Sequence, residues 1–359
     1  MTTLSSVAVG RDNNLNLLRF CAASMVILGH AYPLTRAPGA TDPLGRFGLG
    51  FGGLGVCIFF VISGFLISQS FERRRSSASF WRARVLRIWP GLLVSSLFTA
   101  FVVGSLATNL PRSAYLADPD TWLYPLRAML LRPLADGLFL PGVFERNPFP
   151  RLPNGSVWTL YYEVLCYGLV AVVGLLAPLV RAPKLPLVLV AAVAIFVLYG
   201  LSPPALAIEL KPPLSYYVAF LCGMVAYEGR DRLPLARRWL AASGAAILLF
   251  SGLAYFKVPL ADVFIIVPVA YVVLYVAFWP RLYVRAFNEV GDYSYGIYVY
   301  AFPIQQLLSM WIPGIYALTN AALAFVMTLV PAVLSWHFVE KPSLALKSAP
   351  ARVYRDARV

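Results

Sequence analysis

Arg19 and His30 are two ionisable residues inside one apolar run, residues 15–34. They stand eleven positions apart, and at 100° per residue this spacing ends roughly 20° beyond three helical turns. Both side chains therefore lie on one helix face, separated by roughly 16 Å along the axis. An arginine inside a membrane helix costs about 2.5–3.5 kcal/mol on insertion scales, so such residues indicate a functional site. The plainer alternatives are that Arg19 extends to the lipid headgroups and that His30 hydrogen-bonds to a neighbouring helix.

Glu163 is the acid that we expect beside His30. It falls in the apolar run 157–177, which begins on the side of the membrane where the first run ends, so the two groups are expected at similar depth. A carboxylate that accepts a hydrogen bond from one imidazole nitrogen orients the ring and leaves the other nitrogen free to take a proton. The pattern predicts a catalytic pair, with His30 as general base. The alternative is that Glu163 forms a structural ion pair with an arginine.

Arg84 and Arg87 stand at i and i+3, so they share a helix face at the end of a segment, 72–87, that holds six arginines. Each guanidinium offers a planar fork of donors that suits phosphate oxygens. We therefore expect this pair to bind a multiply phosphorylated ligand. The other arginines of the segment, Arg73 to Arg75 among them, are interpreted as ordinary anchors at the inner membrane surface.

The elements that position these residues are expected to be membrane helices. The chain has 359 residues, of which 60% are hydrophobic and 13% charged, whereas a soluble domain averages about 25% charged. Runs long enough to cross a bilayer recur along the chain, which favours an all-α, polytopic membrane protein with about ten transmembrane helices over a coiled coil, a disordered chain or a cysteine-rich secreted scaffold. The predicted spans are 15–34, 50–71, 88–107, 157–177, 185–201, 212–228, 236–254, 260–279, 291–312 and 317–339.

The distribution of basic residues predicts the orientation. With a cytoplasmic N-terminus, 21 of the 30 Lys and Arg residues fall on the inner side, as the positive-inside rule requires. This places segment 1–14 and the tail 340–359 in the cytoplasm. The loop 108–156, in which we expect short interfacial helices, is then outside. The formal charge of +14 is then an anchoring pattern that faces anionic lipid rather than a nucleic-acid site.

Several other features have a structural interpretation. The four cysteines fall in spans without CxxC spacing, which favours buried thiols over a disulfide or a metal site. His337 is expected to pack at the inner end of the last span, and Asp292 to cap a helix. Asn154 begins a formal but weak glycosylation pattern. Neither a signal peptide nor an internal repeat is evident, so residues 1–359 are expected to form one integral-membrane domain.

Taken together, the motifs resemble the acyltransferase 3 family of bacterial membrane O-acyltransferases over almost the whole chain, in the form without a fused soluble hydrolase-like domain. In chain order they are LLRFCAASMVILGH (17–30), GVCIFFVISGF (55–65), FWRARVLRIWP (80–90), VWTLYYE (157–163), GDYSYGIYVYAFP (291–303) and FVEKP (338–342). Any one of these motifs is weak evidence, but six in order are strong.

The resemblance implies about ten helices in the bacterial cytoplasmic membrane, a cytoplasmic acyl-CoA co-substrate, and transfer of an acyl group, expected to be acetyl, to a hydroxyl. It implies His30 as the essential histidine with Arg19 as its partner. By the same resemblance Arg84 and Arg87 bind the donor, and Glu163 and Glu340 are supporting acids. We also expect Arg19 in the donor site, and Ser63, Trp158 and Tyr295 as further supporting residues. Two positions depart from the family pattern: Asn16 stands where an Asp is usual, and Ala301 where a histidine often stands.

The function predicted from the sequence is a membrane O-acyltransferase that acts on a sugar hydroxyl of a cell-surface or exported glycan. The partners expected are acyl-CoA, a carbohydrate or lipid-linked sugar, and membrane lipid, with no nucleic acid, no metal and no tightly bound cofactor. The rival interpretations are a transporter or flippase, which also carries buried charges, and a non-catalytic partner in polysaccharide export. The acyl group, the acceptor, the oligomeric state and the choice between direct transfer and an acyl-histidine intermediate stay open.

Overall fold

The computed structural model describes residues 2–8, 10, 12–37, 39–74, 76–132 and 137–348. Arg11, Arg75 and the last part of the tail, 349–359, were counted above among the basic anchors and lie outside this part of the chain. Residues 133–136 of the long loop also lie outside it.

Helices form at all ten predicted spans, because long apolar runs can satisfy their backbone groups only within the segment. They are α2 (Leu15–Thr35), α3 (Phe51–Arg73), α4 (Ser77–Leu97) continued by η2 (Phe98–Val103) and α5 (Gly104–Ala107), α8 (Trp158–Leu179), α9 (Lys184–Gly200), α10 (Pro204–Glu228), α11 (Arg237–Tyr255), α12 (Ala261–Phe264) with α13 (Ile266–Phe278), α15 (Ser294–Trp311), and α16 (Ala317–Ser335) continued by η5 (Trp336–Glu340) and α17 (Lys341–Ala345).

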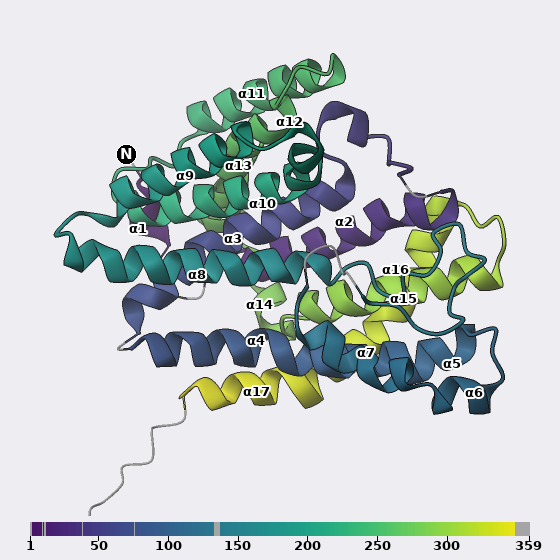
Figure 1. Cartoon of the computed structure of the whole chain (residues 1–359). Helices are drawn as coiled ribbons and strands as arrows, with labels where there is room; N and C mark the ends of the chain where they lie inside the picture. The colour runs from purple at the N-terminus through teal and green to yellow at the C-terminus, as the bar shows by residue number, and fades with distance from the viewer. Residues whose placement is uncertain are drawn as a thin grey trace, which may run out of the picture.

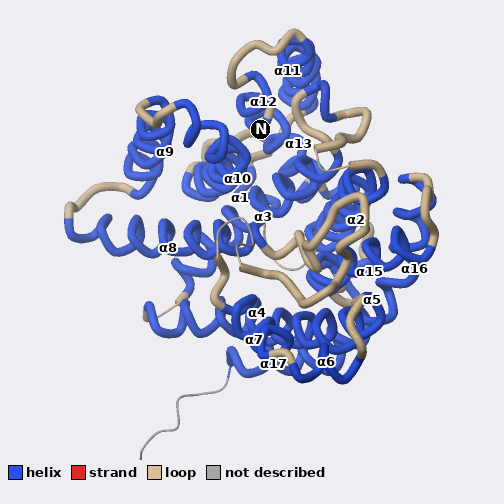
Figure 2. Tube along the Cα trace, turned by 45° about the vertical axis from the view of Figure 1, so that its right-hand side comes forward, coloured by secondary structure: helices blue, strands red, loops and turns tan. Residues whose placement is uncertain are grey.

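The shorter elements are α1 (Leu4–Val7), η1 (Gly45–Phe47), α6 (Arg112–Ala117), α7 (Pro119–Met129), η4 (Pro280–Leu282), α14 (Ala286–Val290) and η6 (Leu346–Ser348). Among the described residues the tube of Figure 2 contains helices and loops but no strand. The prediction of an all-α polytopic membrane protein is confirmed.

Seven of the described helices are long and apolar enough to cross a membrane, and α9 is an apolar helix of 17 residues. The seven segments are Leu15–Thr35, Phe51–Arg73, Ser77–Ala107, Trp158–Leu179, Arg237–Tyr255, Ala261–Phe278 and Ala317–Ala345. The third begins eleven residues before the predicted start of its span, at Ser77 instead of residue 88, so Arg84 and Arg87 lie inside its first half. α15 does not belong to this set although it occupies a predicted span. It carries polar residues and is buried from Ser294 to Ser309, so it needs no apolar face toward lipid.

α3 and α15 lie in the middle of the molecule (Figure 1). α3 packs against α2, α8 and α10, and α15 packs against α2, α4 and α16. α2 therefore joins the two groups of helices. One end of the helix bundle holds α1, α17 and the first turns of α4. The segment between α5 and α8 lies at the opposite end.

Two close helix crossings depend on glycine. A Cβ on Gly29 would lie 2.3 Å from the backbone nitrogen of Gly52, and one on Gly64 would lie 2.0 Å from the carbonyl oxygen of Phe220. Small residues let membrane helices approach until their backbones touch. The first crossing fixes the end of α2, which carries His30, against the start of α3.

The segment 108–156 is ordered where it is described. It contains the short helices α6 and α7, as expected, and the Asn147 and Asn154 side chains bind it to α15 by donating to the backbone oxygens of Gln306 (2.9 Å) and Val299 (2.8 Å). The Asn154 side chain is buried, which argues against its interpretation as a glycosylation acceptor. Trp122 on α7 is 60% exposed, which suits a helix at a membrane interface.

All four cysteines are free. Cys57 and Cys166 are buried and Cys222 is half-buried, in line with the expectation. The expectation is wrong for Cys21, which lies on the exposed face of α2 because the helix turns its polar face toward the interior.

Candidate active site

Basic side chains converge in a cavity of about 330 Å³ between α2, α3, α4, α8 and α15, which we name the guanidinium chamber. Its lining includes Arg19, Ser63, Arg84, Arg87, Glu163, Tyr167, Asp292, Tyr295, Tyr298 and Lys347. All three arginines that we expected to bind the donor thus line one cavity. α4 brings Arg84 and Arg87 to this cavity together because they stand one helical turn apart.

Asp292 connects two of these arginines. Its Oδ2 lies 2.6 Å from Nη2 of Arg87 and 3.3 Å from Nη1 of Arg19, and its Oδ1 accepts a hydrogen bond from Ser294. Glu340 lies 4.0 Å from Nη1 of Arg87. The expectation that Asp292 caps a helix is wrong, because α15 has no side-chain cap and the carboxylate is committed to the guanidinium groups.

Tyr295 and Glu340 support Arg87 from two elements. The Tyr295 hydroxyl donates to the carbonyl oxygen of Ile88 at 2.8 Å, and the Arg87 guanidinium lies 5.8 Å from the centre of its ring. Glu340 is 2% exposed and accepts a hydrogen bond from Ser335 at 3.0 Å. It belongs to η5, a π-helical turn of the kind that is frequent at functional sites.

Arg84 has no carboxylate partner among the described residues, in contrast to Arg87. It is 9% exposed, its Nη2 lies 3.4 Å from the Ser70 hydroxyl, and its buried Nε has no hydrogen-bond partner. Its guanidinium lies 5.6 Å from the centre of the Tyr167 ring. A buried cation without an acid is costly unless a ligand completes its hydrogen bonds.

Glu163 lies in the guanidinium chamber and not beside His30. It accepts hydrogen bonds from the hydroxyls of Ser63 (3.3 Å) and Tyr167. The predicted Glu163–His30 pair is therefore wrong in this structure, because the carboxylate on α8 points toward the arginines instead. Through Tyr167, Glu163 holds the ring on which Arg84 rests.

His30 lines a second cavity, of about 320 Å³, which we name the histidine chamber. Its lining includes Gly29, His30, Asp42, Gly45, Gly50, Gly53, Val56, Trp158, Thr159, Tyr216 and Tyr298. The Nδ1 atom of His30 is buried and has no hydrogen-bond partner in the described part of the chain. Phe302 contacts the ring edge-to-face at a centroid distance of 5.1 Å. Asp42 lines the same chamber, and its carboxylate accepts hydrogen bonds from the backbone nitrogens of Leu44 and Phe51.

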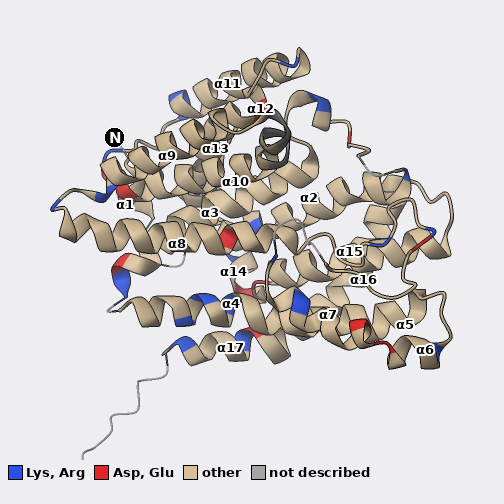
Figure 3. Ribbon diagram, in the orientation of Figure 1, with Lys and Arg blue, Asp and Glu red and all other residues tan. Residues whose placement is uncertain are grey.

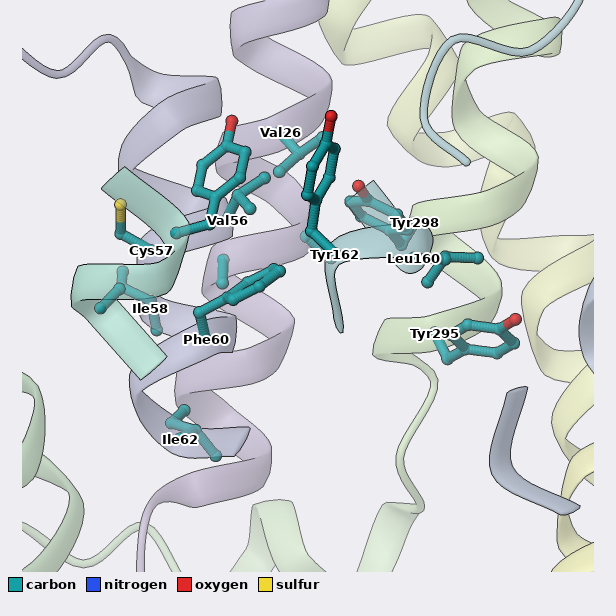
Figure 4. Packing of buried hydrophobic residues seen from close by; sticks show 14 of the residues in the cluster. Val26, Val56, Cys57, Ile58, Phe60, Ile62, Leu160, Tyr162, Tyr295 and Tyr298 are labelled. Carbon is teal, nitrogen blue, oxygen red and sulfur yellow. The ribbon is translucent and has the colours of Figure 1, made fainter. Parts of the chain in front are cut away.

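The two chambers share a wall. Val56, Thr159 and Tyr298 line both of them. Figure 4 looks into this region, with Val56 and Phe60 of α3 on one side and Tyr295 and Tyr298 of α15 on the other. Thr159 and Tyr298 are hydrogen-bonded to each other through their hydroxyls. Arg19 lines the first chamber and His30 the second, so α2 contributes one ionisable side chain to each of two adjoining cavities.

The structure leaves other candidates in plainer roles. His337 is exposed and its Nε2 lies 3.3 Å from the Tyr293 hydroxyl, so it packs at a helix end. No group of three or more His, Cys, Asp or Glu side chains that could hold a metal ion occurs among the described residues.

Three residues of the guanidinium chamber were not predicted from the sequence in the roles that they have here: Asp292 as an ion-pair partner, Tyr167 and Lys347. The motif around Asp292 was noticed, but only contacts across the fold reveal its role.

Comparisons with known proteins agree with the motifs. The acyltransferase-domain model of the acyltransferase 3 family matches residues 12–337. An O-acetyl transferase of Shigella phage Sf6 is 28% identical over 352 residues, which cover 94% of this chain and 98% of that protein. Nodulation protein 10 of Rhizobium leguminosarum bv. viciae is 28% identical over 381 residues, covering 95% of each chain. No solved structure matches. Since the family model spans nearly the whole chain, the protein belongs to the acyltransferase 3 family and is a membrane-embedded acyltransferase.

Proposed function

We propose that this enzyme transfers an acyl group from cytoplasmic acyl-CoA to a hydroxyl of a carbohydrate acceptor on the other side of the membrane. The observation that carries the proposal is the pair of adjoining chambers, one lined by guanidinium groups and one by a histidine with an unpartnered ring nitrogen. The first suits a ligand with several phosphates and the second suits a reacting hydroxyl.

The charge pattern supports this orientation. Basic segments at the start of α4 and on α17 lie close together at the end of the bundle that also holds α1 (Figure 3). A concentration of Lys and Arg at one end is the usual mark of the cytoplasmic side. The guanidinium chamber then receives the donor from the cytoplasm, and the histidine chamber faces outward. The chain is then a multi-pass protein of the bacterial cytoplasmic membrane.

In the proposed reaction His30 acts as general base. A ring nitrogen takes the proton of the acceptor hydroxyl, the hydroxyl oxygen attacks the thioester carbonyl, and the carbon–sulfur bond breaks. The CoA thiolate leaves and recovers the proton from the imidazolium. Positioned proton transfer of this kind contributes about 10²- to 10⁴-fold. An acyl-histidine intermediate would use the same residue as a nucleophile.

The histidine chamber has features that suit a sugar. Trp158 and Tyr216 present aromatic faces, their ring centroids are 5.7 Å apart, and Tyr298 and Thr159 carry hydroxyls. Several glycines line the wall, so a bulky ring can approach the backbone. The Shigella phage relative is named an O-acetyl transferase, which supports an acetyl group as the cargo and oxygen as the acceptor atom.

The test is CoA release by the purified protein in lipid, given acetyl-CoA and candidate glycans. We expect thiol to appear only when an acceptor is present, together with an acetylated product by mass spectrometry. A transporter or flippase would release no CoA. A non-catalytic export partner would keep its function when His30 is replaced. Mass spectrometry of surface glycans from a deletion strain would then identify the acceptor.

A further inference from the structure

The four cations of the guanidinium chamber are not equivalent. Arg87 and Arg19 share the carboxylate of Asp292, and Arg87 also lies near Glu340. A phosphate that binds Arg87 must compete with a carboxylate oxygen at 2.6 Å. Charge-assisted hydrogen bonds this short are strong, so the Asp292 carboxylate offsets much of the positive charge that Arg87 would offer to a ligand.

Arg84 lacks such a partner. Its buried Nε has no hydrogen-bond acceptor within the described residues, and its remaining polar contact is the Ser70 hydroxyl. The side chain is held by the rings of Phe80 and Tyr167, which fix its position without neutralising its charge. A buried guanidinium without an acid at a cavity wall has N–H groups that are free to donate hydrogen bonds to phosphate oxygens.

Lys347 is the second cation without a partner. It belongs to η6, which packs against α4, and it lines the same cavity as Arg84. Its amine forms no ion pair or hydrogen bond with any residue that the structure describes. Burial and the neighbouring guanidinium groups, with Arg84 first among them, lower the pKa of Lys347 to about 7. The fold thus brings an amine from the C-terminal segment to face an unneutralised arginine.

We propose that Arg84 and Lys347 together form the phosphate clamp of the donor, and that Arg87 serves with Arg19 and Asp292 as a charged scaffold. This rests on the proposed function, in which the donor is an acyl-CoA. The two cations repel each other, and an anion between them removes that repulsion. The C-terminal segment is then part of the donor site.

The clamp predicts a pH dependence of donor binding. The charged groups that face Lys347 are the cations Arg84, Arg87, Arg74 and Arg19, while the acids Glu163 and Asp292 line the same chamber. A bound phosphate raises the pKa of the amine, so donor binding above pH 7 must take up a proton. The donor KM should therefore be lowest below pH 7 and rise as the pH increases through about 7.

The experiment compares Lys347→Gln with the matched control Lys341→Gln, which changes an exposed lysine of the preceding helix. The full-length protein is placed in vesicles of phosphatidylcholine, and the donor KM is measured with acetyl-CoA and with acetyl-pantetheine, which lacks phosphate. We expect K347Q to raise the KM for acetyl-CoA about tenfold or more, to flatten its pH profile, and to leave the KM for acetyl-pantetheine unchanged. Lys347→Arg should retain most of the affinity.

An unchanged KM in K347Q, or an equal rise with acetyl-pantetheine, would overturn the clamp. So would an effect seen only in vesicles that contain phosphatidylglycerol, since the lysine would then bind lipid headgroups. Arg84→Gln should behave as K347Q does, whereas Arg87→Gln should lower thermal stability. A donor KM effect of Arg87→Gln as large as that of Arg84→Gln, at unchanged stability, also contradicts the proposal. If the unaltered protein binds no acetyl-CoA at all, the proposed function fails instead.

Discussion

The guanidinium chamber and the histidine chamber have nearly the same volume, but their polar groups are arranged in opposite ways. In the first, Arg19 and Arg87 share an acid from a distant part of the chain, and in the second the imidazole nitrogen Nδ1 of His30 has no partner among the described residues. A buried polar group without a partner is costly and rare in a folded protein. The difference teaches that shared acids hold one part of the site together, and under the proposed function the unpaired atoms of Arg84 and His30 are the ones that ligands complete.

The largest effect is expected from His30→Ala, which removes the proposed base. Transfer should fall by about 10²- to 10⁴-fold, while the protein inserts and accumulates as before, and CoA release under saturating donor measures this. His337→Ala, which alters an exposed ring at a helix end, serves as the control. Normal turnover in the alanine variant would contradict the proposal that the reaction takes place in the histidine chamber while the guanidinium chamber only binds the donor.

Asp292→Asn tests whether the guanidinium chamber is held by its ion pairs. The change leaves two arginines without their shared carboxylate, and breaking a buried pair in this way costs about 3–5 kcal/mol. We expect a clear fall in the midpoint of thermal unfolding in detergent, with Asp120→Asn, which breaks an ion pair of α7, as the comparison. Unaltered stability in the Asp292 variant would show that the network is not structural.

Trp158→Ala tests whether the two chambers bind different substrates. The indole lines the histidine chamber alone, so we expect the acceptor KM to rise about threefold to tenfold through lost aromatic contact. The donor KM should stay within twofold of the original value. Steady-state kinetics with each substrate varied in turn measures both values. A rise in the donor KM with an unchanged acceptor KM would reverse the assignment of the two chambers.

The smallest effect is expected from Glu163→Gln. The carboxylate accepts hydrogen bonds from Ser63 and Tyr167 and acts on Arg84 through the Tyr167 ring, so its loss should raise the donor KM by a few-fold. The pH profile of turnover should not move, because Glu163 does not touch His30. A shift of that profile at unchanged donor KM would restore the pairing that the sequence suggested.

Much of the fold could be predicted because a bilayer requires long apolar helices, and such runs are visible in the residues themselves. α15 shows the limit of this reasoning. The sequence predicts it as a span, 291–312, but the helix is buried from Ser294 to Ser309 by its neighbours, and its polar side chains form hydrogen bonds such as that from Gln305 to Asn320 (3.0 Å). Burial by neighbouring helices, not apolarity, decides its place.

The sequence by itself determined where the ten helical spans lie, because apolar runs are visible in it. It also determined the common face of Arg19 and His30 and the adjacency of Arg84 and Arg87, because both follow from spacing along one helix. Only the tertiary structure decided which acid meets which base. Asp292 reaches Arg19 across 273 positions, and Glu163 turns from His30 toward Tyr167. Helix rotation and crossing set these contacts, and they arise from packing among distant segments that no local pattern encodes.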